Sequence, residues 1–283
     1  MNWARVKTIL IIVFLIVNIF LFFKVTERYS TKELRPAEIS DLKNILAANN
    51  IALETTLPLQ IKYLPRMKVT NNIVEENKTA DEILGRNKWT VKNDGAGNAI
   101  YSSDNKELKF DGYGFVEYTI AVGKNNISEL LTNKTKGKQA IRNILKEYLK
   151  LDKYVEDEAQ IDKTGTRIDY SYYNDKSEIF NNNIVTKILP EGKIVIKHGR
   201  VDSNGFTSKG KKVTPVDAFV EFVRVVKDKG RITIKQISIG YYADLNKGNE
   251  IVRFGEADPA WKIKTDKGTF VFDAYTGNLA ASF

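Results

Sequence analysis

The sequence of 283 residues contains no cysteine and only one histidine. The absence of cysteine excludes a disulfide framework, a thiolate nucleophile and a cysteine metal site. A Ser-His-Asp arrangement would depend on His198, and a histidine-rich metal site is impossible. His198 ends an alternating stretch that begins at Lys193. We therefore interpret it as a satisfied or exposed strand residue rather than as a base or a metal ligand.

Other signatures of chemistry are also missing. The segment Asp94-Gly95-Ala96-Gly97 lacks the third glycine and the following helix of a dinucleotide-binding loop, so we interpret it as a turn. Acidic residues are abundant, as in Glu156-Asp157-Glu158. A carboxylate pair for glycoside hydrolysis stays open, because the fold brings such a pair together. We predict a protein that is not an enzyme, with no catalytic residue, no metal and no cofactor.

The net charge of +9 comes from 44 basic and 35 acidic residues that are spread along the chain. Short basic concentrations occur at Lys134–Lys138 and Lys209–Lys212. We interpret both as solvated loops, with attraction to anionic lipid headgroups or wall polymers as the alternative. We expect no nucleic-acid partner.

One long apolar segment lies near the N-terminus. It runs from Thr8 to Phe23, with basic residues on both sides, and Asn18 is its single polar amide. With its lysine-flanked ends it reaches the roughly 20 residues that one membrane crossing requires. The residues that follow, from Lys24 to Arg28, do not fit a signal-peptide cleavage site. We predict that residues 1–25 form a cytoplasmic stub and an uncleaved transmembrane anchor.

The orientation of this anchor is less clear from the residues. More basic residues follow the segment than precede it, which by the positive-inside rule alone would place the large part in the cytoplasm. Long downstream domains translocate largely regardless of charge, and a first apolar segment near the N-terminus usually acts as an export signal. The residues favour export without excluding the other orientation.

The remainder of the chain shows helix and strand patterns in turn. Amphipathic helices are predicted at 36–50, at 137–154, and from a cap at Thr214 to Gly230. Strand patterns occupy 184–201, 232–242 and 261–272. Helices followed by groups of strands are typical of the α+β class. We predict two α+β units, residues 26–125 and 126–283, each with helices packed on an antiparallel sheet.

The membrane helix itself offers a candidate binding face. An unpaired carboxamide is costly in hydrocarbon, so Asn18 would favour a hydrogen bond to a neighbouring helix. The alternative is that Asn18 bonds the backbone of its own helix, and that the segment is an inert tether. The residues predicted to bind a partner share one face of the helix: Ile11, Phe14, Leu15, Asn18, Leu21 and Phe22.

Both ends of the chain resemble one known family. The opening has Trp3, Arg5, Lys7 and Thr8 before the apolar run, and Asn18-Ile-Phe20-Leu21 within it. The C-terminal part has Asp258-Pro-Ala-Trp261-Lys-Ile263, followed by Phe272-Asp-Ala-Tyr275-Thr-Gly277. These motifs are similar to those of the YycI (WalI) family. Between the two ends only the order of elements can be matched, and Asn2 stands where an acidic residue is common in the family.

The resemblance implies a function that the composition could not supply. Proteins of the YycI family have the N-terminus inside and the folded part outside, which agrees with export and overrides the charge count. They act with a YycH-like protein on the WalK (YycG) sensor histidine kinase, which governs cell-wall metabolism. The implied mechanism is physical contact through the membrane helix and the outer part, without a reaction.

Two other classes of function remain. A wall-polymer-binding module or a wall hydrolase would use the same anchor, and binding to purified wall polymer or release of muropeptides would favour it. A chaperone for exported proteins is the second, and a broad spectrum of captured clients would favour that class.

Overall fold

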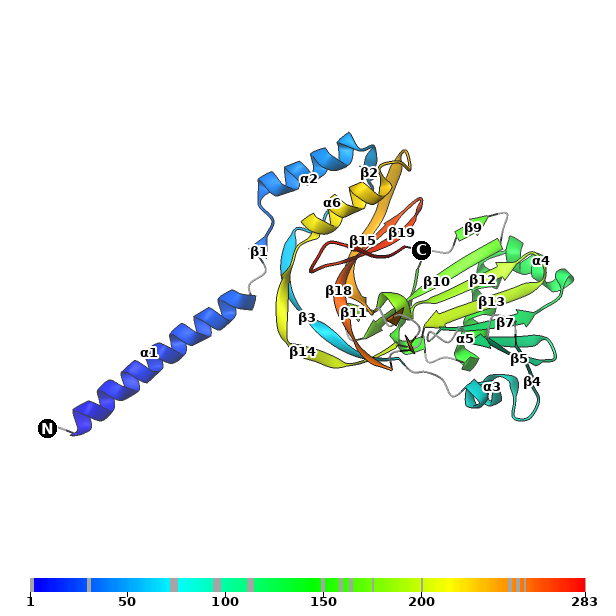
Figure 1. Cartoon of the computed structure of the whole chain (residues 1–283), viewed down its shortest axis with the longest axis horizontal. Coiled ribbons are helices and arrows are strands. Elements are labelled where there is room, and N and C mark those ends of the chain that lie inside the picture. The colour runs from blue at the N-terminus through cyan, green and yellow to red at the C-terminus, as the bar shows by residue number, and fades with distance from the viewer. Residues whose placement is uncertain are drawn as a thin grey trace.

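The computed structural model shows an α+β protein with one mixed sheet, one antiparallel sheet and helices packed on both (Figure 1). A separate pair of short strands consists of β16 (Asn246–Lys247) and β17 (Glu250–Ile251). The structure describes residues 3–29, 32–71, 76–93, 98–110, 115–148, 151–157, 160–162, 165–174, 176–199, 201–243, 246–247, 250–251 and 253–282. The turn predicted at Asp94–Gly97 lies outside these ranges.

The mixed sheet has eight strands in the described part of the chain. Its central path runs β1-β3-β18-β15-β2, with β14 paired to β3, and with β19 and β20 continuing from β18. The strands are β1 (Lys32–Glu33), β2 (Ile51–Leu53), β3 (Gln60–Asn71), β14 (Val201–Val213), β15 (Ile232–Tyr242), β18 (Phe254–Thr265), β19 (Gly268–Asp273) and β20 (Leu279–Ser282).

This sheet corrects the prediction of antiparallel pairing in both units. β2 runs parallel to β15, with Ile51 opposite Ile232. The parallel pair has a simple origin, because β2 follows helix α2 (Pro36–Ala48) and β15 follows helix α6 (Pro215–Val226). The two helices contact each other, and the strands that follow them run in the same direction beneath.

The antiparallel sheet has ten described strands in the order β11-β10-β12-β13-β7-β6-β5-β4, with β8 and β9 paired to β10. The strands are β4 (Thr90–Asn93), β5 (Ala99–Ser103), β6 (Lys106–Phe110), β7 (Phe115–Ala121), β8 (Tyr154–Glu156), β9 (Gln160–Asp162), β10 (Gly165–Asn174), β11 (Ser177–Glu178), β12 (Ile184–Leu189) and β13 (Lys193–Gly199).

The two sheets do not divide the chain at residue 125. β7 lies before that point and β13 after it, yet the two strands pair along their full length. The antiparallel sheet is instead an insertion into the mixed sheet. The chain leaves the mixed sheet at Asn71 and re-enters it at Val201, the residue directly opposite. The pairing of β3 with β14 joins segments far apart in the sequence, so no local pattern predicts it.

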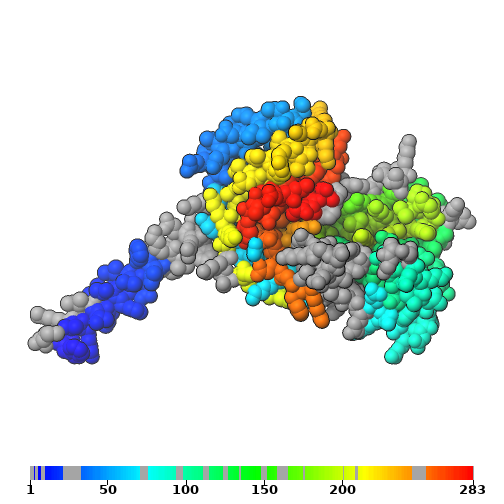
Figure 2. All heavy atoms as spheres, viewed as in Figure 1, coloured from blue at the N-terminus to red at the C-terminus, as the bar shows by residue number. Residues whose placement is uncertain are grey.

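Helices α2 and α6 cover one face of the mixed sheet. Pro36 and Pro215 occupy their first turns, where a missing N–H costs nothing. Phe219 and Phe222 of α6 are buried against Trp261 and Phe272 of the sheet, so the predicted apolar face is confirmed. Thr214 occupies the cap position but makes no side-chain cap bond; its carbonyl accepts the indole N–H of Trp261 at 3.0 Å. Figure 2 shows the two helices side by side on the surface.

Three helices pack on the antiparallel sheet: α3 (Glu76–Leu84), α4 (Lys124–Thr132) and α5 (Lys134–Tyr148). Ile141 and Leu145 of α5 are fully buried, as the predicted helix at 137–154 requires. The helix ends earlier than predicted, because a short 3-10 turn, η1 (Leu151–Lys153), leads into β8, which pairs with β10. Sequence patterns did not predict α3 and α4.

The predicted anchor lies in helix α1 (Trp3–Tyr29), which extends away from both sheets (Figure 1). Among the residues that the structure describes, no helix has the length and apolar character needed to cross a membrane.

Candidate functional site

The candidate binding face on α1 is available to a partner. Ile11, Phe14, Leu15 and Leu21 are all more than half exposed, and Phe14 reaches 68%. Residues three, four and seven positions apart share one face of a helix, so α1 brings these side chains and Asn18 together. Of Phe22 the structure describes the helical position but not the side chain.

Asn18 bonds the backbone of its own helix, which is one of the two parts of the tether alternative. Its Nδ2 donates a hydrogen bond to the carbonyl oxygen of Phe14, 2.8 Å away in the preceding turn. This bond uses one of the two N–H groups that a carboxamide carries. The side chain is therefore partly satisfied within its own helix, while it stays exposed on the same face as Phe14 and Leu15.

His198 and the acidic residues are the remaining candidates for a catalytic or metal-binding role. His198 lies in β13 with 6% of its surface exposed, and its Nδ1 is 3.4 Å from the carbonyl oxygen of Gly199. The prediction of a strand residue is confirmed. Within the described ranges, no three His, Asp or Glu side chains are grouped closely enough to hold a metal ion.

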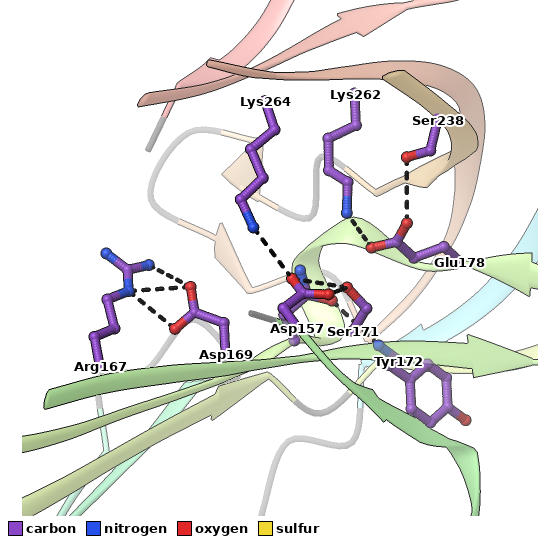
Figure 3. Close-up of polar contacts among 10 residues, drawn as sticks. Asp157, Arg167, Asp169, Ser171, Tyr172, Glu178, Ser238, Lys262 and Lys264 are labelled. Atoms are coloured by element: carbon purple, nitrogen blue, oxygen red, sulfur yellow. Dashed lines mark hydrogen bonds and ion pairs between the residues drawn. The ribbon is translucent and has the colours of Figure 1, made fainter. Parts of the chain in front are cut away.

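The most distinctive polar cluster lies where the two sheets meet. Residues 177–183, here called the junction segment, include β11 and the 3-10 turn η2 (Phe180–Asn182). Glu178 of this segment forms an ion pair with Lys262 of β18, and the side chains are only 2% and 8% exposed. Ser238 of β15 donates a hydrogen bond to the same carboxylate at 3.4 Å. Figure 3 shows Lys262 pointing from the mixed sheet to Glu178.

Two neighbouring asparagines attach the junction segment to the backbone of the mixed sheet. Asn181 donates to the carbonyl oxygen of Ala243 at 2.8 Å and accepts the N–H of the same residue at 3.3 Å. Asn182 makes the same pair of bonds with Val201, at 2.9 and 3.2 Å. Each carboxamide thus binds both backbone groups of one residue, its N–H and its carbonyl oxygen.

The junction segment and strand β15 also approach each other closely. A Cβ added at Gly240 of β15 would lie 2.5 Å from the carbonyl oxygen of Glu178, so only glycine fits there. Ile179 forms an isolated parallel bridge with Tyr241. Both side chains belong to a buried cluster that draws on the two sheets: Met67, Val69, Tyr172, Ile179, Val201, Tyr241, Ala243 and Ala257.

A second lysine of β18 extends this contact. Lys264 lies 3.7 Å from Asp157, which follows β8, and both side chains are about a quarter exposed. Lys262 and Lys264 are two positions apart and so point to the same face of the strand. Each lysine meets an acid from the antiparallel sheet (Figure 3).

A separate ion-pair group holds α5 on the antiparallel sheet. Glu156 accepts hydrogen bonds from Lys138 at 2.6 Å and from Arg142 at 2.6 and 2.9 Å. Burial acts to raise the pKa of Glu156, but these bonds outweigh it and leave the pKa below its ordinary value. Burial, and then the charge of Glu156, raises the pKa of the neighbouring Tyr170 to about 12.

These ion pairs and hydrogen bonds hold strands and helices in place and do not present a reactive side chain. The cations at the junction are each paired with a carboxylate, and Glu178 is closed off from solvent. Sequence reasoning missed the pair because Glu178 and Lys262 are 84 positions apart. The only local signal is a lysine between the apolar residues Trp261 and Ile263 of a strand, which does not identify its partner.

Comparisons with known proteins give one family. The family model described as YycI protein matches residues 30–275. No curated protein matches the chain. Among solved structures, the chain is similar to the Bacillus megaterium YpeB C-terminal domain, with 11% identity and a TM-score of 0.32 over 75% of this chain and 97% of that one.

Proposed function

The chain belongs to the YycI family, and on that premise we propose that it is a non-enzymatic regulator of the WalK (YycG) sensor histidine kinase. Membership implies a regulatory protein associated with WalK, and the family match over residues 30–275 is the observation that carries the proposal. The finer parts of the proposal are that the chain is anchored in the membrane, acts together with a YycH-like protein, and controls signalling in cell-wall metabolism.

The proposed topology has residues 1–25 as a cytoplasmic stub and membrane anchor, and the folded part outside the cytoplasm. The apolar run from Thr8 to Phe23 and the lack of a cleavage site after it support this arrangement. Export also fits a chain without cysteine, because its folding requires no disulfide.

The proposed contact in the membrane uses the face that contains Phe14 and Asn18. Its apolar side chains are exposed in the isolated chain, which leaves them free to pack against a neighbouring helix. The bond from Asn18 to Phe14 reduces the cost of the carboxamide in hydrocarbon, and the other N–H group and the oxygen of Asn18 can still pair with a partner.

The proposed mechanism is a shift in the kinase between signalling states. A protein that binds one state of the kinase more tightly than the other moves the equilibrium by that difference in affinity. Contacts through α1 and through the outer part can both contribute to this difference. No reaction, metal or cofactor is part of the proposal.

The test is reconstitution of the kinase, the YycH-like partner and the full chain in one lipid bilayer. Addition of the chain should change the autophosphorylation rate of the kinase. A chain whose first 25 residues are replaced by an unrelated membrane helix serves as the control and should lose the effect. An unchanged rate with the parent chain would contradict the proposal, and release of muropeptides from purified wall would favour the hydrolase alternative.

A further inference from the structure

We propose that the junction segment, residues 177–183, is a conformational latch that fixes the antiparallel sheet in one orientation on the mixed sheet. This inference concerns the mechanics of the chain itself and goes beyond the regulatory function. It assigns a positioning role to Glu178, Asn181 and Lys262, which no sequence motif identifies.

The topology creates the need for such a latch. The antiparallel sheet is inserted between β3 and β14, and the chain leaves and returns at two residues that lie opposite each other, Asn71 and Val201. Paired residues of neighbouring strands are only about 5 Å apart. Two crossings so close together act as a single attachment, which leaves the inserted sheet free to rotate unless other contacts hold it.

The junction segment supplies attachments away from these crossings. Glu178 reaches Lys262 of β18 and Ser238 of β15, on the far side of β3 from β14. Asn181 binds the backbone of Ala243, just beyond the end of β15. Lys264 adds its ion pair to Asp157. Together with the chain crossings at β3 and β14, these attachments at β15 and β18 hold the inserted sheet at several separate strands.

The polar contacts determine the orientation, while the apolar cluster packs around them without fixing a direction. Apolar packing is non-directional and would tolerate a rotated arrangement of the same side chains. A buried ion pair and two-way backbone hydrogen bonds tolerate little displacement, because an unpaired buried charge or amide is costly. Phe180 adds a further restraint, since Lys262 Nζ lies 5.1 Å from the centre of its ring.

The test measures one distance in the full chain in detergent micelles. One variant carries both Lys146→Cys in α5 and Val220→Cys in α6. Because the sequence contains no other cysteine, these two positions are its only labelling sites. Both positions are exposed, and they lie on helices that cover different sheets. Pulsed electron paramagnetic resonance of two spin labels then gives the distribution of distances between the sheets.

The parent chain should give one narrow distribution. Glu178→Gln should broaden or shift it, because the charge of Lys262 is left buried without a counter-ion. The matched control is Glu129→Gln, which removes a carboxylate from an exposed ion pair with Lys136 at the α4–α5 connection and should leave the distribution unchanged. A narrow distribution at the parent distance in folded Glu178→Gln would overturn the proposal.

A second variant covers the case in which Glu178→Gln does not fold. The triple change Glu178→Leu, Lys262→Met and Asn181→Ala removes the directional contacts of these three residues and leaves no unpaired charge. It should retain the circular dichroism of the parent and still give a broadened or shifted distribution. A triple variant that keeps the narrow parent distribution would overturn the positioning role assigned to Glu178, Asn181 and Lys262. These distances are measured without the kinase, so they decide the latch even if the regulatory function fails its own test.

Discussion

The ion pair between Glu178 and Lys262 predicts a characteristic pattern of stabilities. Lys262→Met removes the cation and leaves a carboxylate that is 2% exposed and that, within the described part of the mixed sheet, keeps a hydrogen bond from the Ser238 hydroxyl alone. Breaking a buried pair from one side typically costs about 3–5 kcal/mol. The remaining bond to Ser238 places this variant near the lower end, at about 3 kcal/mol.

The double variant Glu178→Leu/Lys262→Met should be far less destabilised. Replacing a buried ion pair with apolar residues of similar volume is often neutral, so we expect a stability within about 1 kcal/mol of the parent. For a chain of this size each kcal/mol shifts the Tm by roughly 2–4 °C. The Lys262→Met single variant should therefore melt roughly 6–12 °C below the parent, and the double variant within roughly 4 °C of it.

Thermal unfolding followed by circular dichroism measures all four chains of this cycle, with Glu178→Leu as the other single variant. The two single changes should be strongly non-additive, because each leaves the other charge unpaired. A double variant that loses as much as the sum of the single variants would refute the reasoning, since the two residues would then act independently.

Three further predictions concern other parts of the chain. Asn18→Leu should weaken copurification with the kinase or the YycH-like partner by roughly two- to thirtyfold, or about 0.5–2 kcal/mol, whereas Val13→Leu on another face of α1 should be neutral. Glu156 has a lowered pKa in the folded chain. The stability that it contributes is therefore present above its unfolded pKa of about 4.5 and is lost as the pH falls through the folded pKa. The melting temperatures of Glu156→Gln and of the parent should differ at pH 6 and converge on acidification. A chain that begins near Ser30 should be soluble and folded, and neither zinc, calcium nor ATP should raise its melting temperature by several degrees.

Local patterns predicted the helices that cover the mixed sheet. Pro215 at the start of α6 and the buried positions Phe219 and Phe222 are all encoded within one short segment. The end of α5 was less predictable, because the pairing of Tyr154–Glu156 with β10 overrides the helical pattern that continues in the sequence. The predicted helix boundary is thus wrong where a distant strand pairs with the same residues.

The arrangement of the sheets could not be predicted from the order of elements. The pairing of β7 with β13, and of β3 with β14, joins segments that are separated by whole helices and strands. No local pattern records such long-range pairing. For this reason the expected units 26–125 and 126–283 cut through one sheet.

The two parts of the candidate site differ in the same way. The face of α1 follows from helical periodicity, since Phe14, Asn18 and Leu21 are spaced by four and three. The latch required the structure, because its contacts join β11 and η2 to the distant strands β15 and β18. Their burial and pairing are properties of the folded chain alone.

The central claim is that this chain regulates the kinase through contact along one face of α1. Single photo-crosslinking residues placed along α1 of the full chain, in membranes that contain the kinase and the YycH-like protein, test it most directly. The account predicts crosslinks to these partners from positions 11, 14, 15, 18 and 21, and none from the opposite positions 13, 16 and 20. Crosslinks from all positions alike, or from none, would contradict it.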